Sequence, residues 1–153
     1  MKRALAFILV VGQVLLLVVL LTAPHGTVWT VNGFVIATAV TLVVGGVALA
    51  VRGSATLGPA LTPSPIPREN TPLATGGVYS IVRNPIYTGL MSGGLGLTLI
   101  GSSFLHVLAW LALWGLLAGK ARWDERMLVD EHPAYSEYAA RVGRFLPGVG
   151  RIR

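Results

Sequence analysis

The chain has 153 residues, of which 54% are hydrophobic and only 12% are charged, and its mean hydropathy is +0.71. Soluble domains carry about 25% charged residues, so this composition excludes an ordinary soluble fold and predicts an integral membrane protein. The absence of cysteine excludes disulfides, thiolate metal ligands and a thiol nucleophile. A net charge of +6 in a soluble protein would suggest a nucleic-acid surface, but in a membrane protein the positions of the charges matter more than the net value. We therefore expect no nucleic-acid partner.

Two apolar segments open the chain and predict two membrane spans. The first, residues 4–23, has 20 residues and at about 1.5 Å per residue matches a hydrocarbon core of about 30 Å. It is longer than the apolar core of a signal peptide, so we expect it to be retained. The second span, residues 31–51, follows a turn at Pro24-His25-Gly26. Residues 54–85 then predict a loop, because prolines break any long helix there.

Two further apolar runs predict a helical hairpin. Pro85 suits the first turn of a helix, so residues 86–100 are expected to form a third span and residues 104–118 a fourth. Both runs are short for a bilayer unless the helices tilt or extend at their ends. The remaining residues, 120–153, predict a tail with an amphipathic helix that His132-Pro133 interrupts. The chain is therefore predicted to be one all-α, polytopic membrane domain with four transmembrane helices and a cytoplasmic C-terminal amphipathic helix.

The charged residues predict the orientation of these spans. All basic residues fall on one side of a four-span chain, and so do all acidic ones. The positive-inside rule then places both termini, the 54–85 loop and any active site in the cytoplasm. The high content of Ala, Val and Gly is typical of a bacterial protein, which indicates the inner or plasma membrane. No Asp, Glu, Lys or Arg lies within a predicted span, which disfavours an ion-coupled transporter.

Pairs of charges in the tail have a simple interpretation. Lys120 and Asp124 share one face of a helix, and Arg122 and Glu125 share another, because residues three and four apart are neighbours. Solvated ion pairs explain such spacing without any function, since they are common on surface helices. The order of the motifs around these residues is the observation that favours a functional role for them.

The motifs on the cytoplasmic side follow one another in a particular order. They are Gly77-Val78-Tyr79, Arg83-Asn84-Pro85-Ile86-Tyr87-Thr88-Gly89, Asp124-Glu125 and Tyr135-x-x-Tyr138-x-x-Arg141-Val142-x-Arg144-Phe145-Leu146-Pro147. Over roughly residues 70–148 the chain thereby resembles the isoprenylcysteine carboxyl methyltransferase family, which is related to membrane phospholipid methyltransferases. The first two spans are compatible with this family but carry no motif.

The resemblance implies an S-adenosylmethionine-dependent methyltransferase with its cofactor pocket on the cytosolic side and lateral substrate access from the bilayer. Lys120 takes the position of the family's substrate-side arginine, and Arg122 and Arg83 join it as candidate catalytic residues. Asn84 replaces the motif histidine, so we expect binding and no titrating base at that position. The implied cofactor-binding residues are Thr71, Pro72, Leu73, Ala74, Tyr79, Asn84, Pro85, Ile86, Tyr87, Asp124 and Glu125.

The residue types agree with such a cofactor. N–H groups just after Pro85 can hold the cofactor's carboxylate, and Asp124 or Glu125 can take its ammonium. Tyr79 and Tyr87 can place ring faces near the sulfonium. Since a carboxylate acceptor is already ionised at pH 7, it needs no base. We therefore expect O-methylation of a lipophilic or prenylated, isoprenylcysteine-like carboxylate that Lys120 or Arg122 orients.

Two alternatives remain open at this stage. One is a methyltransferase acting on phospholipid or another membrane lipid, and the other is a catalytically silent membrane scaffold that keeps the pocket as an interaction module. Gly89 and Gly93 serve either close helix packing or the cofactor's bulk. His106 is more simply a hydrogen-bonded packing residue than a ligand, and we expect no metal site. The sequence does not indicate an oligomeric state.

Overall fold

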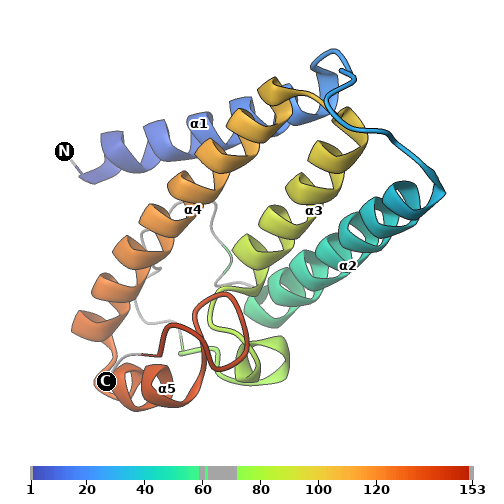
Figure 1. Ribbon diagram of the computed structural model, residues 1–153. Coiled ribbons are helices and arrows are strands. Elements are labelled where there is room, and N and C mark those ends of the chain that lie inside the picture. The colour runs from blue at the N-terminus through green and yellow to red at the C-terminus, as the bar shows by residue number, and fades with distance from the viewer. Residues whose placement is uncertain (1, 59–60, 62–71, 152–153) are drawn as a thin grey trace.

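The protein is described by a computed structural model that covers residues 2–58, 61 and 72–151 and is helical throughout, with no strand among those residues (Figure 1). This confirms the all-α class, while Thr71 and most of the proline-rich loop lie outside the described residues. The elements are α1 Lys2–Thr22, α2 Gly33–Leu57, the 3₁₀ helix η2 Gly77–Ser80, α3 Pro85–Gly101, α4 Phe104–Glu131 and α5 Tyr135–Arg141.

Three of the described helices, α1, α2 and α4, are long and apolar enough to cross a membrane. Their candidate spans are Ala4–Thr22, Gly33–Leu57 and Phe104–Glu131. Helix α3 has 17 residues, which gives about 26 Å against a hydrocarbon core of about 30 Å. The protein is therefore a helical membrane protein with three candidate spans among the described residues, and the predicted third span, residues 86–100, which forms α3, remains a prediction.

Two helices extend beyond the ends that the sequence predicted. Helix α2 continues from the predicted end at residue 51 to Leu57, and Gly58, with a φ of 49°, ends it. Helix α4 is continuous to Glu131, so the separate tail helix expected from residue 120 does not form. A charged sequence does not stop a helix when its residues are good helix formers, which is why the change in composition gave the wrong boundary. The predicted interruption at His132-Pro133 is confirmed.

Helices α2 and α3 lie side by side because glycines remove side chains from their contact (Figure 1). A Cβ on Gly46 would lie 2.5 Å from the carbonyl oxygen of Gly89, and a Cβ on Gly96 would lie 2.6 Å from that of Ala39. A Cβ on Gly93 would meet nothing within 4 Å. The close packing predicted for this helix is therefore present, with Gly89 and Gly96 at the contact.

The two connections that lack charge pack together at one end of the bundle. The N–H of Gly26 donates to the carbonyl of Gly101 at 2.8 Å. His106 is 1% exposed and its Nδ1 lies 2.7 Å from Ser103 Oγ, which confirms its predicted packing role. The charged tail of α4, η2 and α5 gather at the opposite end (Figure 1). Between the two ends lies a buried core that joins α1, α3 and α4: Leu20, Met91, Ala109, Leu113 and Leu117.

Candidate functional site

The first turn of α3 meets the charged third of α4 at the end of the bundle that carries α5. Tyr87 donates its hydroxyl to Asp124 Oδ2 at 2.7 Å. Asn84 donates its side-chain amide to Glu125 Oε1 at 3.1 Å. The structure thus brings together the two motifs that the sequence placed on either side of the hairpin, as the predicted site requires.

Helix α3 begins with unsatisfied backbone donors. Pro85 occupies its first turn, where the missing N–H costs nothing and the fixed φ suits a helix. Asn84 is the N-cap residue, but its side chain makes no capping bond because its amide is turned toward Glu125. Within the described residues, the N–H groups of Ile86 and Tyr87 make no hydrogen bond. A helix start of this kind can bind a carboxylate.

Glu125 is the centre of a buried ion-pair cluster. Its side chain is 4% exposed and accepts from Arg144 Nε at 3.0 Å and Arg144 Nη2 at 2.7 Å. Arg83 Nη2 lies 3.3 Å from Glu125 Oε1. The hydrogen bonds to Glu125 raise the pKa of Arg144 and keep it charged. Arg144 was not among the predicted site residues, although its place in the closing motif was a signal that could have suggested it.

Arg83 fastens the segment after α5 to the base of α3. Its guanidinium donates to the carbonyls of Ala139 at 3.2 Å and Gly150 at 2.7 Å, and its Nε has no partner among the described residues. Its backbone N–H donates to the carbonyl of Gly143 at 2.8 Å. The Arg83 side chain is 0% exposed, so an acceptor reaches it only if this segment moves. The catalytic role predicted for Arg83 stays a prediction.

Lys120 faces the interior of the bundle. It is 2% exposed, its Nζ donates to Gln13 Oε1 at 2.9 Å, and Nζ lies 5.3 Å from the ring centroid of Tyr87. This burial rules out the interpretation of Lys120 as half of a solvated surface pair. Sequence reasoning missed Gln13, although an amide in the middle of an apolar helix was a detectable signal. Lys120, Tyr87 and Asp124 therefore converge on one side of α4.

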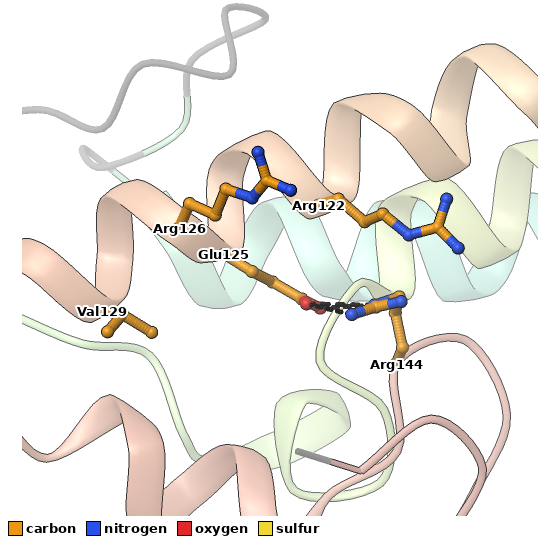
Figure 2. Close-up of a pocket in the computed structure, with 5 residues that line it drawn as sticks. All are labelled: Arg122, Glu125, Arg126, Val129 and Arg144. Carbon is orange, nitrogen blue, oxygen red and sulfur yellow. Dashed lines mark hydrogen bonds and ion pairs between the residues drawn. The ribbon is translucent and has the colours of Figure 1, made fainter.

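Arg122 lies on a different face of α4. Two residues from Lys120, it is turned by about 200° around the helix. It is exposed, and it forms no ion pair with Glu125, which pairs with Arg83 and Arg144. A pocket of about 240 Å³ lies there, lined by Arg122, Glu125, Arg126, Val129 and Arg144 (Figure 2). The structure therefore does not bring Arg122 together with Lys120.

Neutral tyrosines support the other side of the site. Tyr138 donates its hydroxyl to the carbonyl of Tyr79 in η2. Burial raises the pKa of Tyr138 to about 12, although the charge of Arg83 opposes the shift. Burial also raises the pKa values of Tyr79 and Tyr135, so all three remain hydrogen-bond donors near neutral pH.

The described part of the predicted cofactor loop runs beside α5. Leu73 packs against a buried cluster on α5 whose members are Tyr135, Tyr138 and Ala139. Pro72 is exposed and Ala74 is half-buried. Leu73 and Tyr79 thus both contact α5, and the cofactor-binding roles of Pro72, Leu73, Ala74 and Tyr79 remain predictions.

Comparison with known proteins identifies the family. The family model described as phospholipid methyltransferase matches residues 34–132, which is more than half of the chain and includes α3, α4 and all of α2 except its first residue. The cobalt-zinc-cadmium resistance protein CzcN of Cupriavidus metallidurans is 39% identical over 88 residues, 56% of this chain and 40% of that protein. The chain thus matches less than half the length of this relative.

The family assignment rests on these sequence matches. No solved structure matches the chain. Within residues 2–58, 61 and 72–151, no group of three or more His, Cys, Asp or Glu side chains is placed to hold a metal ion. The matched region contains both the Asn84–Tyr87 turn and the Asp124–Glu125 pair. The chain belongs to the phospholipid methyltransferase family, part of the isoprenylcysteine carboxyl methyltransferase-like membrane methyltransferases.

Proposed function

We propose that the protein is an S-adenosylmethionine-dependent methyltransferase whose single domain, residues 1–153, is embedded in the bacterial inner membrane. Helices α1 to α4 cross the bilayer, with α3 packed between α2 and α4, and the end that carries α5 faces the cytoplasm. Family membership supports the activity, and the three candidate spans support the membrane location. The one-sided distribution of basic residues supports the orientation.

The residues at the start of α3 fit the proposed cofactor, which supplies an electrophilic methyl group when bound. The uncapped N–H groups of Ile86 and Tyr87 suit its carboxylate. Asp124 suits its ammonium better than Glu125 does, because both oxygens of Glu125 already accept from Arg144. Besides the N–H groups at the start of α3 and the Asp124 carboxylate, we assign the following residues to the cofactor site: Thr71, Pro72, Leu73, Ala74, Tyr79, Asn84 and Pro85.

The buried ammonium of Lys120 favours an anionic acceptor. Its position 5.3 Å from the Tyr87 ring, on the face of α4 that carries Asp124, places a positive charge beside the proposed cofactor site. A carboxylate there is held by charge and is already ionised at pH 7, so the protein has to orient it and exclude water. We therefore propose O-methylation of an isoprenylcysteine-like carboxylate that Lys120 orients. Arg122 lies on another face of α4 and the Arg83 side chain is 0% exposed, so neither joins Lys120 in this proposal, and their catalytic roles stay predictions from the sequence.

A phospholipid acceptor is the second candidate. The family model that matches the chain is the one described as phospholipid methyltransferase, which favours a lipid headgroup as the methyl acceptor. Against it stands the charge of the site, since a protonated amine is repelled by Lys120. The observation that carries the proposal is common to both acceptors: the Tyr87–Asp124 hydrogen bond, which joins the start of α3 to α4 beside the buried lysine.

Binding of the cofactor tests the proposal against a silent scaffold. Calorimetry on the purified protein in detergent is expected to show saturable binding of S-adenosylmethionine. Asp124→Asn should weaken this binding at least tenfold, while Asp130→Asn, which removes an exposed charge from the same helix, should leave it unchanged. Absence of saturable binding in folded protein, or equal effects of both substitutions, would contradict the assigned site.

Methyl transfer then distinguishes the two acceptors. The wild-type protein is given labelled cofactor together with either a prenylcysteine analogue or a phospholipid extract. We expect label in the prenylcysteine analogue that is released by base, as an ester requires. Base-stable label in the phospholipid fraction would instead establish the second candidate.

A further inference from the structure

The pocket on the outer face of α4 carries an excess of positive charge. Arg122 and Arg126 extend from α4 and Arg144 lies across from them, with Glu125 between (Figure 2). Neither Arg122 nor Arg126 makes a hydrogen bond or an ion pair with any residue from 2–58, 61 or 72–151. Two guanidinium groups beside one pocket therefore lack a counter-charge in the described part of the protein.

Glu125 does not supply that counter-charge. Its Oε1 accepts from Asn84 and Arg144 and lies 3.3 Å from Arg83, while its Oε2 accepts from Arg144 at 2.7 Å. Two arginines thus neutralise one carboxylate before Arg122 and Arg126 are counted. Arg144 uses Nε and Nη2 for this carboxylate and keeps the N–H groups of Nη1 for a further acceptor.

The position of the pocket along α4 matches the phosphate layer of a bilayer. The apolar part of α4, residues 104–118, is about 22 Å long, so a core of about 30 Å centred on it extends about 4 Å past residue 118. Arg122 lies about 6 Å past that residue and Arg126 about 12 Å past it. The two side chains therefore bracket the level just outside the hydrocarbon core, where lipid phosphates lie.

We propose that this pocket binds a phosphate group. A tetrahedral phosphate offers oxygens in several directions, so Arg122, Arg126 and Arg144 can each donate to it, and arginine forks match phosphate geometry. Val129 adds an apolar wall on the side of the pocket. A lipid headgroup and free phosphate share this chemistry, and the bilayer depth of the pocket favours the lipid.

The arginine pocket faces away from Lys120 and Asp124, but it shares Glu125 with the site at the start of α3, because Glu125 lines the pocket and accepts from Asn84. Lys120 and Asp124 lie on one face of α4, and Arg122 and Arg126 each lie about 200° from the corresponding residue. The inference does not rest on the proposed function, and its test measures binding and not methyl transfer.

The test uses the full-length protein in detergent with three short-chain probes. Calorimetric titrations are made with dioctanoyl phosphatidic acid, with inorganic phosphate, and with dioctanoylglycerol, which has the same acyl chains and no phosphate. The variant R122Q/R126Q removes the two charges without a partner in the described residues. R141Q is the matched control, because the Arg141 side chain is 72% exposed and pairs with Glu137 on α5, outside the pocket.

We expect saturable binding of phosphatidic acid, at least tenfold weaker in R122Q/R126Q and unchanged in R141Q. Equal affinity for inorganic phosphate would support the pocket and assign it to free phosphate, whereas preference for phosphatidic acid assigns it to a lipid headgroup. Equal binding by wild type and R122Q/R126Q, or equal affinity for dioctanoylglycerol, would overturn the proposal. Circular dichroism checks folding, and the single variants R122Q and R126Q carry the same comparison if the double variant is misfolded.

Discussion

The contact between α2 and α3 leaves no room for a side chain at Gly46. A Cβ at this position would lie 2.5 Å from the carbonyl oxygen of Gly89 and 2.9 Å from the backbone nitrogen of Gly93. Both obstacles are backbone atoms, so Gly46→Ala must push the two helices apart. Overpacking of this kind costs about 1–3 kcal/mol. We expect the melting temperature of the detergent-solubilised protein to fall by roughly 2–12 °C.

Gly45→Ala is the matched control for this prediction. A Cβ on this neighbouring glycine would meet nothing within 4 Å, so alanine there finds no obstacle and gains helix propensity of up to about 1 kcal/mol. Thermal unfolding followed by circular dichroism compares the two variants under identical conditions. If Gly46→Ala is as stable as Gly45→Ala, the backbone contact does not hold α2 against α3 and the packing argument fails.

Three further predictions concern the charged end of the bundle. Glu125→Gln leaves the fully buried Arg83 without its carboxylate, so the free energy of unfolding in denaturant should fall by about 3–5 kcal/mol. The control Glu137→Gln removes one partner of an exposed ion pair and should cost less than about 1 kcal/mol. Equal losses in the two variants would refute the burial argument. Tyr138→Phe removes the hydrogen bond to the Tyr79 carbonyl and should cost about 1–3 kcal/mol in the same assay, and an unchanged midpoint would contradict it. Burial raises the pKa of Tyr138 from 10.0 to about 12, so between these values the folded state keeps a proton that the unfolded state releases. The contribution of Tyr138 to the free energy of unfolding is therefore present below pH 10 and is lost as the pH rises toward 12. A pH series between about 9 and 12 should show a shallower loss of stability for Tyr138→Phe than for wild type.

Features with a local cause could be predicted from the sequence. Helix α3 begins at Pro85, within one residue of the predicted start, because proline at the first turn acts through its own ring and φ angle. The interruption at His132-Pro133 was predicted for the same reason. The sequence wrongly predicted that the helix ends at residue 118. The change there from apolar to charged residues marks a change in the surroundings of α4, and its backbone stays helical to Glu131.

Features that depend on distant parts of the chain were harder to predict. The ion-pair cluster forms because the backbone of Arg83 and Asn84 pairs with Gly143 and Arg144, about 60 residues later in the chain. No hydrophobic periodicity reports such a pairing. The order of the motifs indicated that Asn84 and Glu125 belong together, but Arg144 acquires its role only through this pairing. Gln13 likewise becomes part of the site only because α1 packs against α4.

The unbroken helix α4 joins the lipid-embedded part of the protein rigidly to its charged end. About 21 Å of continuous helix separates Glu125 from the middle of the apolar segment, so a tilt of 10° about that middle displaces Glu125 by about 4 Å. Apolar helices tilt when the thickness of the bilayer changes. Because Tyr87 and Asn84 donate to Asp124 and Glu125, the start of α3 has to follow such a displacement of α4 if these two hydrogen bonds are to be kept.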